Sequence, residues 1–416
     1  METYKEPARE IPIARDTDVV VIGGGPAGLA AAIASARNGA RTTLVERYGF
    51  LGGMATAGLM ANLNGFRNQV EPDATQTVRG IAEELVLEIK KLGGIGKSPY
   101  PQKDYPGEPG KMAYSYAIDT EMFKYVALKM CSDAGVDIMF QAWFSLPVME
   151  GNRVRGVIVE DKSGRRALLA RIVVDASGDG DVAARAGAPF WHTMEAGEPR
   201  LANSLMYRIR FGDKRPSAPM AMDMGTDAVV WGPSSPLIDG TDADALSREE
   251  IAARLKVYAD FAEKQSGHPE MADARVAETP VMLGIRQTRF IEGEYQITGD
   301  DAIEGRRMKD SVAMSSCPII SYYGYRRYLT HEGYDIPYRC LVPKKIDGLL
   351  VAGRCISSDQ RAYESHRAML PMMAIGQAAG TAAALCAAGN VQPRSLDVES
   401  LRKTLAGQGA VIGLAK

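Results

Sequence analysis

Strand-like and helix-like patterns alternate at the start of the chain. Residues 18–22 (DVVVI) form a short β-branched run, which predicts a buried parallel strand because it is too short for a helix. Residues 29–38 are rich in alanine and predict a helix, which Gly39 would end. A second β-rich run follows at 41–45. This order predicts a βαβ unit with two neighbouring parallel strands.

The turn after the first strand carries candidate chemistry. Gly23, Gly25 and Gly28 have G-x-G-x-x-G spacing, and Glu46 closes the second strand 18 residues after Gly28. In such a unit the glycines allow a tight turn, close approach of a pyrophosphate and close helix packing, while the acid meets ribose hydroxyls. Glycine-rich turns without function are common, but the combined pattern favours a dinucleotide site.

A second glycine-rich loop follows directly. Gly52, Gly53 and Thr56 lie in RYGFLGGMATAGLM. Their bare backbone suits a loop that runs beside a flat ligand, and it equally suits a plain connection. The residues alone leave both interpretations open.

Patterns further along the chain predict more elements: a capped amphipathic helix at 120–134, a strand at 136–140, strands at 154–160 and 167–169 joined by a turn, a strand at 171–176, and a surface helix at 242–264. The strand at 171–176 precedes Gly178, Gly180 and Ala183, which fit G-x-G-x-x-A. No acid follows about twenty residues later in a second β-rich strand, so a separate NAD(P)H subdomain is not favoured.

The composition changes at about residue 190. From there to 338 Pro and Gly are frequent, and buried-strand style returns at 348–354 (GLLVAGR). We therefore predict a first domain in two parts, 1–189 and 339–416, with a substrate domain inserted at 190–338. Residues 372–388 predict a helix of small side chains, with Gly376 and Gly380 on one face for close approach to a ligand or simply to a packed neighbour.

Charge and composition limit the partners. The formal net charge is −2, which gives no electrostatic reason to expect nucleic acid. The sequence contains no run of eighteen apolar residues, so no membrane span is predicted. The first residues lack the apolar core of a signal peptide. The five cysteines and four histidines show no metal-ligand spacing. We expect a cytoplasmic, metal-free protein that acts on a small molecule, with a homo-oligomer left open.

Four stretches resemble a known family. They are DVVVIGGGPAGLAAA with LVERYGFLGGMATAG, RIVVDASGDGDVAARAGA, GIRQTRFIEGEYQIT, and IPYRCLVPKKIDGLLVAGRCISSD with GQAAGTAAAL. They resemble FAD-dependent oxidoreductases of the two-domain, glutathione-reductase-like superfamily, in the branch whose first FAD loop reads L-G-G-x-x-T. The resemblance implies an α/β fold: a Rossmann-like FAD-binding domain with a parallel sheet and an inserted mixed α+β cap domain. The chain lacks the C-x-x-x-x-C disulfide and the separate NADPH unit, so disulfide reduction is not expected.

The resemblance also implies which residues hold FAD. They are Gly23, Gly25, Pro26, Ala27 and Gly28 at the pyrophosphate, Glu46 and Arg47 at the adenosine, Gly52, Gly53, Met54 and Thr56 near the ribityl chain or flavin ring, Ala176, Ser177 and Gly178 at a second turn, and Gly353 and Arg354 under the ribityl chain. The helix that carries Gly376 would point its positive end at the flavin pyrimidine edge and stabilise the anionic reduced flavin.

The substrate would lie where the last strands return. His366 could exchange a proton there, and Arg367 could hold a carboxylate; a solvated or salt-bridged turn is the alternative. Tyr338 and Tyr363 are substrate candidates, with Tyr322 and Tyr323 considered beside them. We expect hydride transfer between flavin and a small polar organic substrate at the domain interface. The alternatives are a monooxygenase and a flavin-bound tRNA-modification protein, against which the lack of a basic stripe counts.

Overall fold

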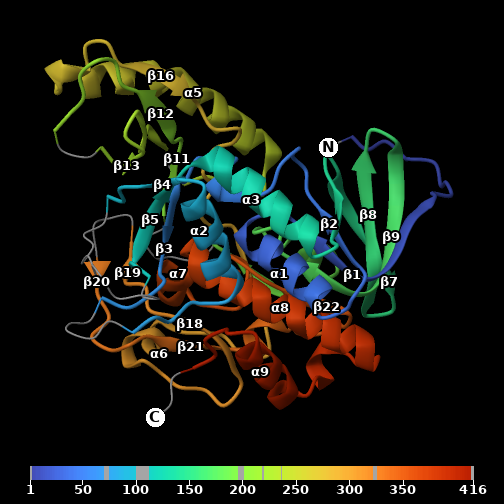
Figure 1. Cartoon of the computed structure of the whole chain (residues 1–416). Coiled ribbons are helices and arrows are strands. Elements are labelled where there is room, and N and C mark those ends of the chain that lie inside the picture. The colour runs from blue at the N-terminus through green and yellow to red at the C-terminus, as the bar shows by residue number, and fades with distance from the viewer. Residues whose placement is uncertain are drawn as a thin grey trace.

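The computed structural model describes residues 2–69, 75–99, 112–194, 201–217, 220–235, 237–321 and 326–413. The fold is α/β, and its main sheet is largely parallel, as predicted (Figure 1). The parallel strands, in spatial order, are β6 (Asp137–Met139), β2 (Thr42–Val45), β1 (Ile13–Ile22), β9 (Gly164–Asp175) and β22 (Leu349–Val351). Because they run the same way, their carboxyl ends meet at one edge.

Two antiparallel strands extend this sheet. β7 (Trp143–Glu150) pairs with β8 (Arg153–Asp161), which pairs with the first half of β9. The tight turn between Asp161 and Gly164 confirms the predicted hairpin. Since β22 pairs only with the second half of β9, the two neighbours share one edge of that long strand.

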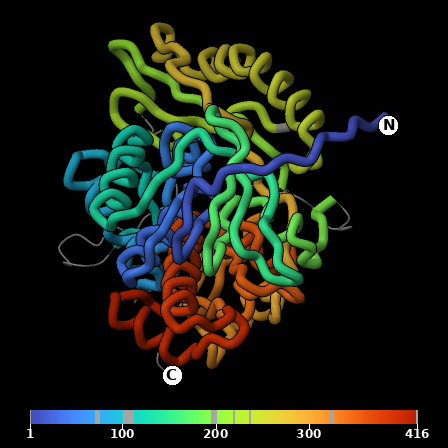
Figure 2. Tube along the Cα trace, turned by 90° about the vertical axis from the view of Figure 1, so that its right-hand side faces the viewer, coloured from blue at the N-terminus to red at the C-terminus, as the bar shows by residue number. Residues whose placement is uncertain are grey.

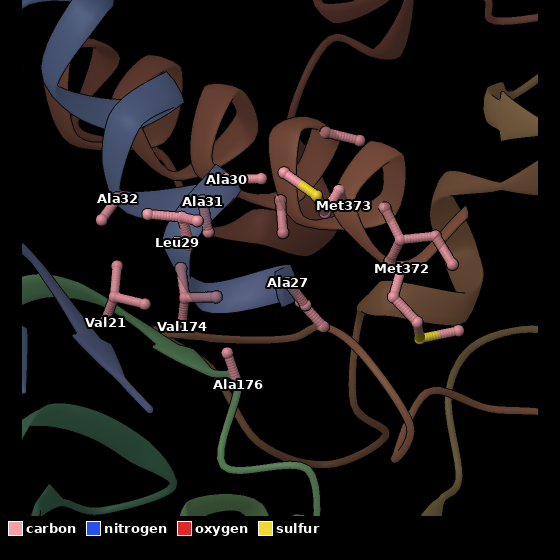
Figure 3. Packing of buried hydrophobic residues seen from close by; sticks show 14 of the residues in the cluster. Val21, Ala27, Leu29, Ala30, Ala31, Ala32, Val174, Ala176, Met372 and Met373 are labelled. Atoms are coloured by element: carbon pink, nitrogen blue, oxygen red, sulfur yellow. The ribbon is translucent and has the colours of Figure 1, made fainter. Parts of the chain in front are cut away.

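Helices cover the parallel sheet. They include α1 (Pro26–Arg37), α2 (Ile81–Lys91), α3 (Thr120–Asp133), α4 (Asp181–Arg185) and α8 (Met369–Gly389). The predicted helix at 120–134 is α3, and the Asp119 side chain caps it by accepting hydrogen bonds from the Glu121 and Met122 backbone N–H groups, at 2.8 and 2.9 Å. In Figure 3 α1 lies between Val21 and Val174 of the sheet and Met372 and Met373 of α8.

α1 and α8 approach closely. A Cβ on Gly376 would overlap the carbonyl oxygen of Ala27, and one on Gly380 would overlap that of Ala31. Among the described residues one helix, α8, is long and apolar enough to cross a bilayer. However, 89% of its most apolar 18-residue stretch is buried inside the protein. Its composition follows from its position at the centre of the main core.

A second hydrophobic cluster lies at one end of the molecule, at the opposite end from α9 (Val398–Gly407) (Figures 1 and 2). Its antiparallel sheet contains, in spatial order, β13 (Met222–Asp223), β14 (Asp227–Val230), β12 (Tyr207–Arg210) and β16 (Arg275–Glu278). The long helix α5 (Ala243–Ser266) covers it, as the surface-helix prediction at 242–264 implies.

The main core also draws on the predicted insertion. Ile291, Ile297, Val312 and Ile336 pack in the main cluster, whereas the second cluster is built from residues between 205 and 285. The segment with a core of its own is therefore shorter than 190–338, and the sequence boundaries remain a prediction.

Short elements complete the fold. They are β3 (Asn62–Asn64), β4 (Ile95–Gly96), β5 (Ser115–Ile118), β10 (Phe190–His192), β11 (Asn203–Ser204), β15 (Ser234–Ser235), β17 (Arg289–Ile291), β18 (Ser311–Ser315), β19 (Ile319–Ile320), β20 (Arg326–Arg327), β21 (Tyr334–Pro337), α6 (Gly299–Glu304) and α7 (Gln360–His366).

Candidate cofactor and substrate site

A pocket of about 380 Å³ opens at the edge where the parallel strands end. It is lined by the turns that follow β1, β2, β9 and β22, by the start of α8, and by residues at the start of α5. The chain crosses from one side of β1 to the other between β2 and β9, and ligands of open α/β sheets bind at such a switch point.

The turn after β1 is shaped to approach a ligand. Gly23 has φ +97°, and a Cβ there would lie 2.6 Å from the Ala176 carbonyl oxygen. A Cβ on Gly25 would meet only Gly53 Cα, at 3.8 Å, and both glycines line the pocket. α1 begins at Pro26 with no side-chain cap, so its first N–H groups are left for a ligand. This bare backbone fits a pyrophosphate.

Glu46 lies next to that turn at the end of β2. Its Oε2 accepts from the Gly24 N–H at 2.7 Å, and its Oε1 accepts from the Tyr48 N–H at 3.0 Å. Burial raises the pKa of the Glu46 carboxyl, while these hydrogen bonds to the charged form oppose the rise. Each carboxylate oxygen can accept a further bond, so the group is able to bind ribose hydroxyls.

Beyond Glu46 the pocket becomes aromatic and cationic. The Arg47 guanidinium lies 5.0 Å from the Tyr48 ring centroid and 5.4 Å from that of Trp143. Arg47 Nη2 also approaches Met282 Sδ at 3.2 Å. All of these residues line the pocket, and they suit the base of an adenosine whose ribose is at Glu46.

The turn after β9 is held by a buried acid. Asp175 Oδ1 accepts from Ser177 Oγ at 2.6 Å, and its Oδ2 accepts from the Ala183 N–H at 2.9 Å. Burial raises the pKa of Asp175 to about 6. The sequence analysis missed this residue, although an acid that ends a buried strand just before a glycine-rich turn is a signal for such a role.

An ion pair connects this turn to the one after β22. Arg354 Nη2 lies 3.0 Å from Asp179 Oδ1, and Arg354 also donates to the Ile285 carbonyl. Thr288 donates to the same Asp179 oxygen at 2.9 Å. The ion pair between Arg354 and Asp179 therefore holds the two pocket turns against each other. The sequence did not reveal that Asp179 takes part in this pair.

Most of the predicted cofactor residues come together in the pocket. Those that line it are Gly23, Gly25, Pro26, Ala27, Glu46, Arg47, Gly53, Met54, Ala176, Ser177, Gly178, Gly353 and Arg354. Gly240, Thr241, Ala243, Leu246 and Met282 also line it and were missed, because nothing in their local sequence shows that the second cluster folds over the sheet edge.

Four predicted cofactor residues have other positions. Gly28 packs against Gly23, where a Cβ would overlap the carbonyl oxygen, so it allows close packing of helix on strand. Gly52 has φ +115°, and the buried Thr56 hydroxyl donates to the Leu51 carbonyl at 2.9 Å; both hold the loop in shape. Gly376 packs against α1, which corrects its assignment to the cofactor.

The predicted catalytic pair is divided. Arg367 lines the pocket beside Met369 and Met372, where α8 begins. Its Nε is buried and has no hydrogen-bond partner within the described part of the chain, and its Nη2 makes a 3.5 Å contact with the Ile320 carbonyl. An ionised, partly unsatisfied guanidinium in a pocket favours an anionic ligand group.

His366 does not support the predicted proton transfer. Its side chain is fully buried in α7, and burial lowers its pKa to about 3, so the ring stays neutral near pH 7. Neither ring nitrogen has a hydrogen-bond partner among the described residues, and the ring packs edge-on against Tyr363. The segment is also a buried helix, not the solvated turn considered as the alternative.

The two tyrosines assigned to substrate are core residues. Tyr363 is buried, donates to the Arg286 carbonyl and packs edge-on against Phe290 at 4.9 Å. Tyr338 is buried and donates to the Pro393 carbonyl at 2.9 Å. Since neither side chain lines the pocket, their assignment is corrected; Tyr322 and Tyr323 lie outside the described residues. Within the described ranges no group of three His, Cys, Asp or Glu is placed to hold a metal.

The pocket lies at the carboxyl edge of a parallel sheet, beside a glycine-rich turn and the carboxylate of Glu46. These features define a dinucleotide-binding α/β protein, and the pocket residues fit FAD. The sequence profile of the FAD dependent oxidoreductase family matches residues 18–213 and 198–405. The chain belongs to this family. It is an enzyme, an FAD-dependent oxidoreductase, and FAD is its cofactor.

The chain has low sequence identity to the characterised proteins that it resembles. The chain is 26% identical over 171 residues to digeranylgeranylglycerophospholipid reductase of Methanoculleus marisnigri. The aligned segment covers 41% of each of the two chains. A geranylgeranyl bacteriochlorophyll reductase-like protein of Thermoplasma acidophilum has a similar fold, with TM-score 0.53, 15% identity and coverage of 95% of this chain and 84% of that one. The flavin-dependent brominase Bmp2 gives TM-score 0.50 at 13% identity, over 94% and 83%. The aligned segment is thus about two fifths of the named reductase.

Proposed function

We propose that this flavoenzyme transfers hydride between FAD and a small polar organic substrate, one anionic group of which is held by Arg367. The observation that carries the proposal is the position of Arg367: it lines the pocket at the start of α8 with its Nε buried and unpaired within the described residues. A guanidinium stays protonated, so Arg367 would bind and orient without exchanging a proton.

The remaining pocket residues divide the work. FAD supplies the hydride chemistry when bound. Gly25 and the start of α1 would hold the pyrophosphate, and Glu46 would hold the ribose. Met369 and Met372 line the same pocket as Arg367, and their apolar side chains would strengthen its attraction for an anion by excluding water. Similarity to an enzyme named as a reductase supports transfer between flavin and substrate.

The proposal is tested by anaerobic mixing of the FAD-loaded enzyme with small carboxylic acids and their neutral amides. We expect a carboxylate to change the flavin absorbance without another reductant, and its amide to react more weakly. Reduction by NAD(P)H alone, followed by incorporation of oxygen into the product, would instead establish a monooxygenase. A salt-sensitive complex with tRNA would favour the third alternative.

Arg367→Lys sharpens the test, because lysine keeps the charge and loses the planar fork. Substrate binding should weaken by about 1.5–3 kcal/mol, the range for a hydrogen bond to a charged group, while FAD stays bound. Arg361→Lys is the matched control, since Arg361 lies in the same segment but pairs with Asp300 at the surface. Equal substrate affinities in both variants would remove Arg367 from the proposed site.

A further inference from the structure

The thioether of Met282 receives two hydrogen bonds in the pocket. Arg47 Nη2 and the Tyr48 hydroxyl each lie 3.2 Å from Met282 Sδ. All three residues line the pocket, but Met282 comes from the region of the second cluster, 235 residues after Arg47. Sulfur is a weak and polarisable acceptor. The contact therefore connects the region of the second cluster to the residues that follow β2.

The backbone around Met282 is held from two sides. The Val281 and Met282 N–H groups donate to the Ala57 carbonyl, at 2.8 and 3.2 Å. The Leu283 N–H donates to Glu250 Oε2 at 2.6 Å, and the Leu283 side chain is buried in the second cluster. Because both neighbours of Met282 are anchored, the thioether extends from a restrained backbone. Such restraint allows one side chain to orient another.

Arg47 depends on contacts of this kind for its orientation. Its guanidinium forms no salt bridge with any residue in the described ranges. The neighbouring Glu46 carboxylate accepts from backbone N–H groups instead. The Tyr48 and Trp143 rings attract the guanidinium, but a ring face does not select one of its N–H groups. A guanidinium has five N–H donors, so the one that Met282 accepts leaves several that a ligand can use.

We propose that Met282 is a positioning residue for the adenosine half of FAD. By accepting from Arg47, it orients the guanidinium at the end of the pocket where Glu46 lies. Adenine offers ring nitrogen acceptors to guanidinium donors, and its flat face suits the Trp143 ring, which is 54% exposed. Flavin mononucleotide (FMN) lacks the adenosine. The region of the second cluster therefore takes part in selecting the dinucleotide over FMN.

Titrations of the FAD-depleted full chain with FAD and with FMN test this role. Met282→Leu keeps an apolar side chain of similar size and removes the sulfur acceptor. Its FAD dissociation constant should rise about three- to tenfold, the range for one weak hydrogen bond, and its FMN dissociation constant should change less than about twofold. Met372→Leu is the matched control, since Met372 lines the same pocket at the start of α8 and should leave the ratio of the two constants unchanged. Retained circular dichroism shows that each protein is folded.

A double-variant cycle tests the link to Arg47. Arg47→Ala should raise the FAD dissociation constant, and adding Met282→Leu should raise it little further, because the donor that the sulfur orients is gone. Met282→Gln should bind FAD more tightly than Met282→Leu, since the amide oxygen restores an acceptor on a side chain of similar length.

Three results would overturn the proposal. Equal losses of FAD and FMN affinity in Met282→Leu would mean that this residue only shapes the pocket. Losses that add up in the double variant, or no recovery in Met282→Gln, would mean that the sulfur does not act through Arg47. A wild type that binds FMN as tightly as FAD would mean that the adenosine half is not recognised.

Discussion

At the residue scale, Gly25 and Gly28 show how two glycines of one motif differ. A Cβ on Gly28 would overlap the Gly23 carbonyl oxygen, whereas a Cβ on Gly25 has ordinary contact distance to Gly53 and points to the pocket. Gly25 also has φ −69°, which any residue adopts. Gly28 thus serves the fold, and Gly25 keeps space for the ligand.

This difference predicts that Gly25→Val folds without retaining FAD. The added side chain would occupy the space of the pyrophosphate but would collide with little of the protein. Purified variant protein should be colourless, with a wild-type circular dichroism spectrum. Gly267→Val is the control, since its Cβ also has ordinary contact distances and lies at the far end of α5. Full FAD occupancy in Gly25→Val would show that no phosphate approaches this backbone.

His366 predicts a dependence of stability on pH. The unfolded chain takes up a proton near pH 6.5, whereas the buried ring does so only near pH 3. The folded state binds fewer protons in between, so the free energy of unfolding falls as pH falls below about 6.5, by about 1.4 kcal/mol per pH unit. Between pH 7 and pH 5 this residue should remove about 2 kcal/mol.

The measurement compares denaturant unfolding of wild type and His366→Leu, both saturated with FAD, at the two pH values. The wild type should lose about 2 kcal/mol more than the variant, because other groups titrate alike in both. Asp175, whose raised pKa acts in the opposite direction, cancels in this difference. Equal losses would mean that His366 titrates normally in the folded protein.

Single residues were predictable where chemistry depends on local spacing. The turn glycines and Glu46 come to the pocket because strand, turn and helix fix their geometry over a short stretch. His366 was predicted to transfer a proton and Tyr363 to contact the substrate, but both side chains are buried. Their burial depends on packing against residues distant in the sequence, such as Phe290 beside Tyr363, which the local pattern does not show. Asp179 could not be found, because its partner Arg354 is 175 residues away.

At the scale of elements, the contact between α1 and α8 supports both core and site. Gly376 meets the backbone of Ala27, which lines the pocket, and Gly380 meets that of Ala31, one turn deeper in the core. The sequence predicted both helices from their small residues. The sequence left open whether the glycine face of α8 approaches a ligand or packs against a neighbour. The answer depended on α1, which lies more than 300 residues away in the sequence.

Val substitutions should separate the two positions. Gly376→Val and Gly380→Val should each destabilise the protein by about 1–3 kcal/mol or more, because α8 must move away from α1. Only Gly376→Val should also weaken FAD binding, since it displaces Ala27 at the cofactor turn. Gly389→Val is the control, because at the end of the same helix a Cβ would make only ordinary contacts with the Val391 side chain, at 3.8 and 4.0 Å. Chemical unfolding and FAD titration measure the two effects, and equal FAD affinities would refute the link.

At the scale of the whole molecule, the pocket joins two hydrophobic clusters. Its floor comes from the sheet edge, while Leu246 and Met282 come from the region of the second cluster. The change of composition near residue 190 indicated a second unit. It could not show that residues 291–338 return to the main core, because those contacts join segments far apart in the sequence.

FAD should therefore stabilise the molecule as one cooperative unit. Free FAD at one hundred times its dissociation constant adds about 2.7 kcal/mol to the free energy of unfolding, provided that the unfolded chain does not bind it. Because residues of both regions line the pocket, bound FAD should link them, and calorimetry of the FAD-loaded enzyme should show one transition. Gly25→Val, which lacks the cofactor, should show the smaller second cluster melting first, in a separate transition that added FAD does not shift. A single transition in this variant would mean that side-chain packing alone, without the cofactor, couples the two clusters.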